Sequence, residues 1–222
     1  MRPGFLQPGM KLLYRIILML TWIFFKGVYR HRVYGLEHFY TKSAILAPNH
    51  TSFLDPPLVA ISWPGEVHFL ARESLFRVPL LGPLIRALNA HPVTGDASDI
   101  AVFKTVTLLL KEGKQLILFP EGTRSDDDAL GVIKPGISLL IARANSAIIP
   151  TYVHGTFEIW GRERKFPKLC GKTACVFGSP ILWESFAHLE KKEAQRALAD
   201  RLFCSITALR SWYESGAEGI PP

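Results

Sequence analysis

Short apolar runs alternate with amphipathic segments along most of this chain. Runs of strand length occupy six stretches, residues 31–36, 44–47, 66–71, 90–93, 115–119 and 173–177. Other stretches have the apolar spacing of helices that face a core, at residues 78–88, 96–111 and 190–213. Because strands and helices follow one another in turn, we expect an α/β fold in which helices flank a central, mostly parallel or mixed sheet on both faces.

The first apolar segment has a different pattern. Ten uncharged residues separate Arg15 from Lys26, whereas a helix needs about 20 apolar residues to cross a bilayer. On a helical wheel, basic and aromatic residues share one sector of about 100° and apolar residues fill the rest. The residues of this sector that we predict to bind membrane are Lys11, Arg15, Trp22, Lys26 and Arg30, and Tyr29 lies among them. The pattern predicts a helix lying in the membrane interface, with a buried core helix as the alternative.

Length and composition indicate one folded unit. The chain has 222 residues, of which 48% are hydrophobic and 20% charged, as in an ordinary globular protein. We predict an interface helix over residues 1–30, an α/β domain over 31–215 and a tail over 216–222. No small-residue cleavage site follows the first apolar segment, so we expect no cleavable signal peptide.

The positive charge is local. Residues 1–42 carry seven Lys or Arg and one acid, and so account for most of the formal net charge of +7. A basic segment with ten apolar neighbours suits an anionic phospholipid surface better than nucleic acid. We therefore expect a protein associated with the cytoplasmic face of a membrane and no nucleic-acid partner.

The three cysteines, Cys170, Cys175 and Cys204, form no C-x2-C pair and no zinc spacing with histidine. This usage indicates a reducing compartment and no structural metal.

A histidine and an aspartate follow the second strand in the segment AILAPNHTSFLD. His50 stands where the predicted strand ends, and Asp55 opens a segment with two prolines that is typical of a helix start. A tight turn brings the Asp55 carboxylate back to one imidazole nitrogen, which leaves the other nitrogen to take a proton as a general base. The alternatives are a helix-capping Asp55 and a turn histidine. A serine hydrolase using the adjacent Ser52 is disfavoured, because the chain has no G-x-S-x-G elbow.

A second loop with candidate functional residues follows the strand at 115–119 and has the sequence PEGTRS. Gly122 lets backbone N–H groups approach an anion, and Arg124 offers a planar fork that suits phosphate. The loop lacks the Walker spacing, so nucleotide hydrolysis is disfavoured. The alternatives are that Glu121 braces the loop and that Arg124 pairs with the acidic residues at 126–128.

Together, the N-H-x4-D and F-P-E-G-T-R-S segments, about seventy residues apart, resemble the motifs of glycerolipid acyltransferases. The likeness is strongest to 1-acyl-sn-glycerol-3-phosphate acyltransferases, and it extends to the segments at residues 71–75, 134–136 and 148–151. It covers most of residues 30–180. The resemblance implies the single-domain α/β fold of that family.

The resemblance also implies a reaction. An acyl thioester, acyl-CoA or acyl carrier protein, is the co-substrate, no cofactor takes part, and the chain passes to the sn-2 hydroxyl of lysophosphatidate to give phosphatidate. His50 is the expected general base and Asp55 the residue that orients it. Arg124 with the Gly122 backbone is expected to hold the acceptor phosphate. The other substrate-binding residues expected at this site are Arg72, a second phosphate candidate, Thr123 and Glu121, the last chiefly to shape the loop.

One position departs from the family pattern. Gly95 stands where the family commonly carries an arginine, and Arg86, His91 or Lys104 is a possible replacement. Two alternative functions therefore stay open. One is an acyltransferase of the same fold that uses glycerol 3-phosphate or another lysophospholipid, and the other is a lipid-binding protein without catalysis.

Overall fold

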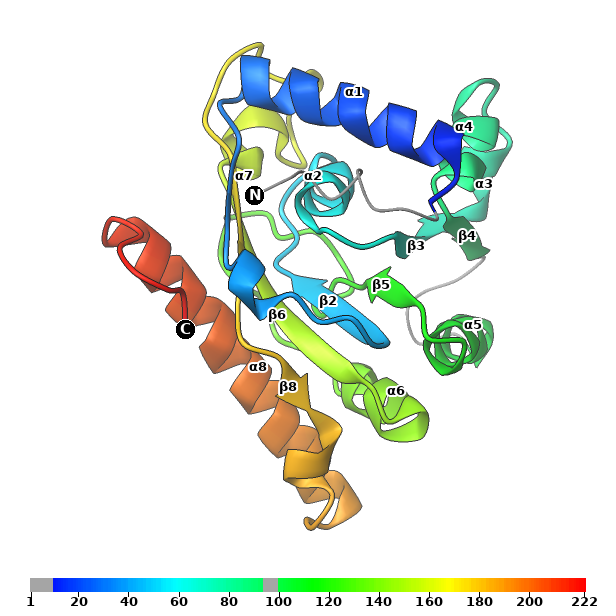
Figure 1. Cartoon of the computed structure of the whole chain (residues 1–222), viewed down its shortest axis with the longest axis vertical. Helices are drawn as coiled ribbons and strands as arrows, with labels where there is room; N and C mark the ends of the chain where they lie inside the picture. Colours follow the sequence, from blue (N-terminus) through cyan, green and yellow to red (C-terminus); the bar gives the residue numbers. More distant parts are fainter. Residues whose placement is uncertain (1–9, 94–99) are drawn as a thin grey trace.

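The apolar runs form the strands of one sheet in the computed structural model, which describes residues 10–93 and 100–222 (Figure 1). The strands are β1 Arg32–Tyr34, β2 Ala44–Pro48, β3 Val67–Arg72, β4 Ala90–Val93, β5 Gln115–Ile117, β6 Ala147–His154, β7 Ala174–Phe177 and β8 Ile181–Leu182. Their order is β1-β7-β6-β2-β5-β3-β4, and β8 pairs with β6. The predicted α/β fold with a central mixed sheet is confirmed.

Five neighbouring strands, β6, β2, β5, β3 and β4, run parallel, whereas β7 is antiparallel to β6. The parallel strands are nearly continuous apolar runs, as expected for a sheet covered on both faces. Their carboxyl ends meet at one edge, where open α/β sheets bind ligands. The loops after β2, β5 and β3 therefore lie together.

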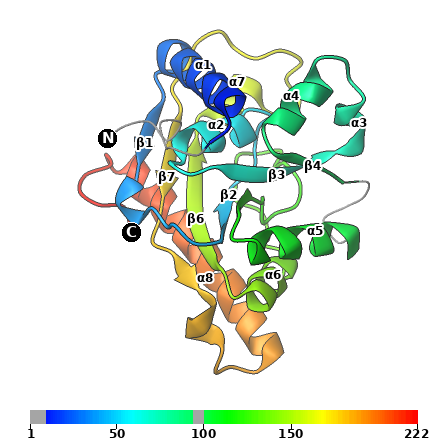
Figure 2. The same cartoon turned by 45° about the vertical axis from the view of Figure 1, so that its right-hand side comes forward.

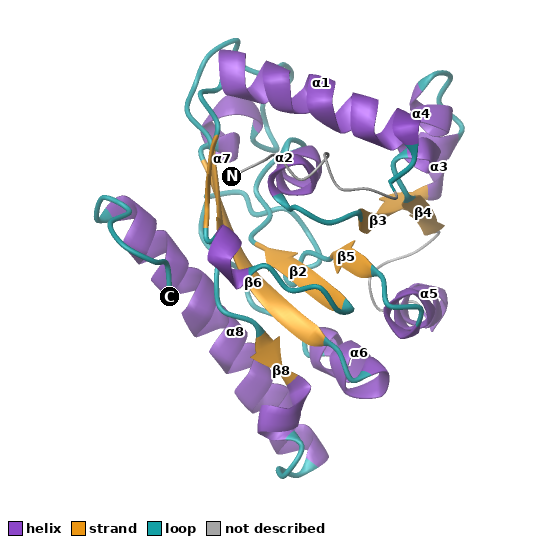
Figure 3. Cartoon of the chain, viewed as in Figure 1, coloured by secondary structure: helices purple, strands orange, loops and turns teal. Residues whose placement is uncertain are grey.

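Helices cover both faces of this sheet (Figure 3). The helices are α1 Leu12–Val28, α2 Asp55–Ser62, α3 Glu73–Phe76, α4 Leu81–Ala87, α5 Ile100–Lys111, α6 Gly136–Ala144, α7 Thr156–Trp160 and α8 Lys191–Glu214. Helices α1 and α2 pack into one core with β2 and β7, and α5, α6 and α8 pack into a second core on the other face. The sheet thus separates an α1–α2 layer from an α5–α6–α8 layer (Figures 1 and 2).

Most predicted elements are present, with a few differences. The start predicted for the helix at 96–111 and the position of Gly95 lie outside the described residues. Helix α7 falls in a stretch that the sequence pattern leaves as a loop. The segment predicted as a tail packs on the domain, since the Pro221 carbonyl lies 2.9 Å from His38 Nε2 and the Pro222 carbonyl accepts from Ser179 N–H.

Helix α1 rests on the domain along one side. Tyr14, Leu18 and Phe25 are buried against the α2 side of the core. Trp22 packs against the same core, and Tyr29, which follows the end of the helix, is buried. Both aromatic residues therefore contact protein, whereas the helical wheel predicted that they lie at the membrane. A helix packed on a domain must bury one side, and α1 ends at Val28, so the wheel does not apply to Tyr29.

The other side of α1 is apolar and exposed. Seven large side chains there are 38–71% exposed: Leu12, Leu13, Ile16, Met19, Leu20, Ile23 and Phe24. Lys11, Lys26 and Arg30 are also exposed. Within the described residues, no helix is both long enough and apolar enough to cross a membrane.

Candidate active site

The register of the sheet brings together the loop after β2, which carries His50, and the loop after β5, which carries Glu121 and Arg124. Leu46 of β2 pairs with Ile117 of β5, and His50 and Glu121 each lie four residues further along. The His50 backbone N–H donates to Glu121 Oε1 at 2.8 Å, and the Ser125 N–H donates to the His50 carbonyl at 2.8 Å. Two loops seventy residues apart are thus joined at His50.

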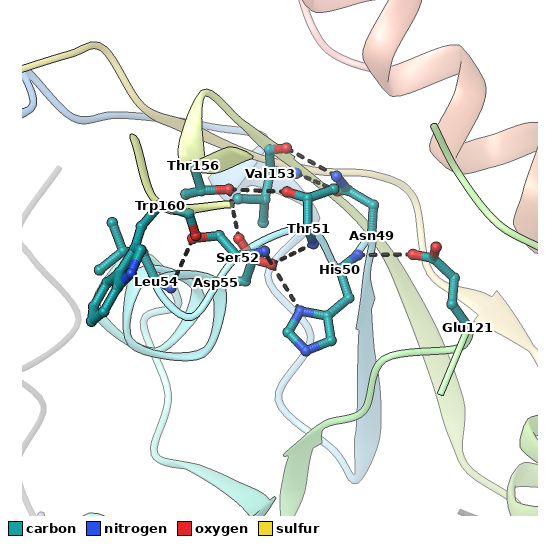
Figure 4. Close-up of polar contacts among 10 residues, drawn as sticks. All are labelled: Asn49, His50, Thr51, Ser52, Leu54, Asp55, Glu121, Val153, Thr156 and Trp160. Atoms are coloured by element: carbon teal, nitrogen blue, oxygen red, sulfur yellow. Dashed lines mark hydrogen bonds and ion pairs between the residues drawn. The ribbon is translucent and has the colours of Figure 1, made fainter. Parts of the chain in front are cut away.

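The Asp55 carboxylate holds the His50 ring. His50 Nδ1 donates to Asp55 Oδ2 at 2.8 Å, as expected from the spacing, and Asp55 is fully buried (Figure 4). The same oxygen accepts the backbone N–H groups of Thr51 and Ser52, each at 2.8 Å. With its hydrogen on Nδ1, the imidazole presents Nε2 as the free acceptor.

Thr156 is a contributor that sequence reasoning missed. Its hydroxyl donates to Asp55 Oδ1 at 2.6 Å from the start of α7 (Figure 4). Both oxygens of the carboxylate therefore accept hydrogen bonds from within the protein, three at Oδ2 and one at Oδ1. No local signal marks Thr156, because its partner lies about a hundred residues earlier in the chain.

Asn49 anchors the turn that carries His50 to the neighbouring strand. Its side-chain oxygen accepts from the Val153 N–H at 2.7 Å, and its amide donates to the Val153 carbonyl at 3.1 Å. The pair of bonds ties the His50 turn to the end of β6, so the backbone that carries the imidazole is held by the sheet.

The His50 ring lies flat on a second aromatic ring. It stacks on Phe119 with ring centroids 3.7 Å apart, and the His50 side chain is 17% exposed. No group among the described residues hydrogen-bonds to Nε2. This nitrogen can therefore accept a proton from a bound molecule.

Ser52 is not arranged as a nucleophile. The serine is buried, its hydroxyl donates to the Trp160 carbonyl at 2.7 Å, and its oxygen accepts from the Leu54 N–H at 3.1 Å. It makes no hydrogen bond to His50 in the described structure. The arrangement therefore lacks the nucleophile-to-base contact of a serine hydrolase.

Glu121 braces the loops. Its Oε2 accepts from the Gly131 N–H at 2.9 Å while Oε1 accepts from His50, so both oxygens are occupied. Burial raises the pKa of Glu121, and the hydrogen bonds from Gly131 and His50 oppose that shift. This placement matches the expected loop-shaping role, and Glu121 also lines the polar cleft that contains Arg124.

Arg124 is held at the mouth of the site. Its guanidinium lies 3.6 Å above the Phe53 ring, and among the described residues Nη1 has no hydrogen-bond partner although it is buried. Burial lowers the pKa of Arg124, and Arg162 adds to that effect. A guanidinium nitrogen without a partner can donate to an oxygen of a bound anion.

The acidic residues that follow Arg124 contact other groups. Asp126 pairs with Arg162 at 3.1 Å, and the side chain of Asp128 lies 3.6 Å from Arg210 of α8. Neither Asp126 nor Asp128 therefore forms an ion pair with Arg124 in the described structure, contrary to the alternative in which they pair with it.

The other residues predicted to bind substrate are Gly122, Thr123 and Arg72. Gly122 has φ +76°, a backbone conformation that favours glycine, and a side chain there would have to displace the Lys134 ammonium. Thr123 is exposed and lines the same polar cleft as Arg124, and Arg72 is exposed at the end of β3. Of the three residues weighed as replacements for the family arginine, Arg86 lies over Phe76 and His91 is hydrogen-bonded to His68 at 2.9 Å.

Two cavities adjoin the site. A polar cleft of about 650 Å³ contains Arg124, Lys134 and Arg162. An apolar pocket of about 270 Å³ lies between α5, the loop after β5 and α6, and Phe103, Phe119 and Leu140 are among its lining residues. Gly122 and Lys134 border the apolar pocket, and Lys134 borders both cavities. The site thus offers an anion position beside an apolar one.

The sequence and the fold of this chain match those of known proteins. The Acyltransferase family model matches residues 30–154. The chain is 28% identical to 1-acyl-sn-glycerol-3-phosphate acyltransferase of Bacillus subtilis over 182 residues, 81% of this chain and 88% of that protein. It is 30% identical over 135 residues to the chloroplastic 1-acyl-sn-glycerol-3-phosphate acyltransferase LPAT1 of Arabidopsis thaliana, 59% of this chain and 38% of that protein.

A solved structure also matches. The crystal structure of the 1-acyl-sn-glycerophosphate acyltransferase from Thermotoga maritima superposes with a TM-score of 0.72 at 22% identity, over 93% of this chain and 85% of that one. The similarity shows a shared fold.

Proposed function

Because the chain belongs to the acyltransferase family, we propose that it transfers an acyl chain from a thioester to the sn-2 hydroxyl of 1-acyl-sn-glycerol 3-phosphate, giving phosphatidate. The observation that carries the proposal is the His50–Asp55 pair beside the Arg124 guanidinium, whose Nη1 has no hydrogen-bond partner among the described residues. A base next to a phosphate-binding fork is what a phosphorylated alcohol needs in order to become a nucleophile.

The residues support a direct transfer. His50 Nε2 takes the proton of the acceptor hydroxyl while the hydroxyl oxygen attacks the thioester carbonyl. Collapse of the intermediate breaks the carbon–sulfur bond, and the imidazolium returns its proton to the leaving thiolate. The buried Asp55 carboxylate stabilises the imidazolium between these steps. No enzyme residue is acylated, and no cofactor takes part.

The donor and acceptor are tested together. The apolar pocket between α5 and α6 suits a hydrocarbon chain, and the donor is acyl-CoA or acyl carrier protein. An assay of purified protein with both donors against lysophosphatidate, glycerol 3-phosphate and a choline lysophospholipid separates the candidates. We expect lysophosphatidate to be preferred. Preference for glycerol 3-phosphate or the larger headgroup would favour the alternative acceptors, and absence of turnover with every pair would favour lipid binding alone.

We expect Arg124 to govern acceptor binding. Arg124→Ala removes a charge-assisted phosphate contact worth roughly 1.5–3 kcal/mol, so the KM for lysophosphatidate should rise roughly tenfold to a hundredfold. Arg124→Lys should recover only part of this loss, since an ammonium cannot form the planar fork. Steady-state kinetics with acceptor varied is the measurement.

Arg77→Ala is the matched control, because its partner Glu73 is on the surface and the pair is exposed. Equal acceptor kinetics in Arg124→Ala and the parent protein would assign Arg124 a structural role instead.

We further propose that α1 lies in the interface of an anionic membrane on its cytoplasmic face. Its exposed apolar side and the neighbouring Lys11, Lys26 and Arg30 support this location. Each basic residue near such a surface contributes about 1 kcal/mol. Reversing Lys11, Arg15, Lys26 and Arg30 to Glu should therefore abolish co-sedimentation with phosphatidylglycerol vesicles at physiological salt.

The control for this prediction reverses the same number of exposed charges on α8, at Lys191, Lys192, Arg196 and Arg201. Both variants change net charge equally, so only the location differs. Equal vesicle binding by the two variants would contradict an interfacial α1.

A further inference from the structure

The loop after α7, residues 162–172, combines basic residues with exposed apolar ones. Residues 162–172 contain five Lys or Arg and one acid, and two large apolar residues stand among them. Phe166 is 72% exposed and Leu169 is 87% exposed. Cationic side chains around exposed apolar tips are typical of segments that bind anionic lipid surfaces.

Hydrogen bonds at several points hold this loop. The Lys168 N–H donates to the Ile159 carbonyl at 3.0 Å, and the Trp160 indole donates to the Arg164 carbonyl at 3.1 Å. The Tyr29 hydroxyl, just beyond the end of α1, donates to the Lys168 carbonyl at 3.0 Å. Phe166 and Leu169 are therefore presented to solvent by a braced loop, and the bond from Tyr29 fixes that loop to the end of α1.

The loop and α1 lie on the same side of the molecule. In Figures 1 and 2 the loop, drawn in yellow, rises beside the end of α1 on the side away from the α5–α6–α8 layer. Helix α1, with its exposed apolar side chains, also belongs to the layer on this side of the sheet. Two separate apolar surfaces with basic neighbours thus stand side by side.

We propose that residues 162–172 form a second membrane contact, with Phe166 and Leu169 entering the interface of an anionic bilayer and the basic residues of the loop binding lipid headgroups. Charge selects this occupant. A second copy of the chain that docked through the same loop would oppose one basic loop with another, whereas an anionic lipid surface attracts the cations of the loop.

The contact would bring the bilayer to the mouth of the site. The loop starts beside the His50 turn, because Gly161 forms a β-bridge with Ser52. Its first residue, Arg162, pairs with Asp126 of the loop that carries Arg124. A bilayer held by this loop would therefore place lipid beside the Phe53 and Arg124 side chains.

Two native cysteines allow a matched test. Cys170 is exposed within the loop, Cys204 is exposed on α8 of the opposite layer, and Cys175 is buried. An environment-sensitive fluorophore is attached to Cys170 in a Cys204→Ser chain and to Cys204 in a Cys170→Ser chain. Each protein is then mixed with vesicles of equal parts phosphatidylglycerol and phosphatidylcholine, with and without nitroxide-labelled lipid.

We expect a blue shift and nitroxide quenching at Cys170 and neither at Cys204. Vesicle binding with an unchanged Cys170 label would overturn the loop contact while leaving the α1 proposal standing. A blue shift at Cys170 that rises with protein concentration in the absence of vesicles would also overturn it, in favour of self-association.

A pair of variants provides an independent measurement. Phe166→Ser with Leu169→Ser should weaken vesicle partitioning about tenfold or more, because two apolar side chains no longer leave water. Leu108→Ser is the control, since Leu108 is 59% exposed on α5 of the opposite layer. Activity on detergent-dispersed substrates should be unchanged in both proteins. Equal vesicle affinity in the double variant and the parent, or an equal loss in Leu108→Ser, would overturn the proposal.

Discussion

Replacing His50 with alanine is expected to lower turnover by about 10²–10⁴-fold, the usual contribution of a positioned general base. The imidazole is the group whose Nε2 is free, and its other nitrogen is fixed to Asp55 at 2.8 Å. The fold should survive, because Asp55 keeps its bonds from Thr51, Ser52 and Thr156 when the ring is removed. Turnover with saturating donor and acceptor, together with circular dichroism and the melting temperature, measures both effects.

His188→Ala is the control, since His188 is exposed and far along the chain from the site. Full turnover in His50→Ala with an intact fold would remove the base from the mechanism. If His50→Ala does not fold, His50→Gln tests the same role. This variant keeps a polar group of similar length and is expected to be as inactive.

The direct mechanism has a covalent consequence. No acyl-enzyme should build up when donor is supplied without acceptor, because Ser52 donates to the Trp160 carbonyl and does not reach His50. Ser52→Ala should therefore lose much less activity than His50→Ala. Intact-protein mass spectrometry decides the point, and an acyl adduct that is absent in Ser52→Ala and passes to added lysophosphatidate would establish the serine mechanism.

Asp55→Asn is expected to lower turnover by about 10³–10⁴-fold, as when an amide replaces the carboxylate behind a catalytic histidine. In one orientation the amide oxygen still accepts from His50 but carries no charge to stabilise the imidazolium. In the other orientation the amide donates to Nδ1 and selects the tautomer whose Nε2 is already protonated. Either orientation disables the base.

Thr156→Val separates this effect from a general loosening of the site. It removes the bond to Asp55 Oδ1 at 2.6 Å but leaves the charge and the contact to His50. We expect a much smaller loss of turnover than in Asp55→Asn, with a comparable melting temperature. Similar losses in the two variants would mean that the Asp55 carboxylate acts only by holding the turn.

The sequence alone predicted strands β1 to β5 and β7, most of the longer helices and the contact between His50 and Asp55, but it did not predict β6 or β8. Apolar periodicity reports burial along one segment, and a five-residue turn restricts where two side chains can lie. The ends of elements were less exact, since β5 stops at Ile117, before Phe119 turns to stack on the His50 ring. Helix α7 was missed because its five residues show no periodicity of their own.

Only the tertiary structure decided which distant groups meet at His50. Glu121 and Thr156 reach the His50 turn because β2 pairs with both β5 and β6, and nothing near either residue encodes that register. Arg124 likewise reaches Phe53 from a distant loop, and Trp22 packs partly against the core because α1 docks on the α2 side of the domain. Local patterns state that a side chain is apolar or charged, whereas its partner is selected by the packing of strands and helices that are far apart in the chain.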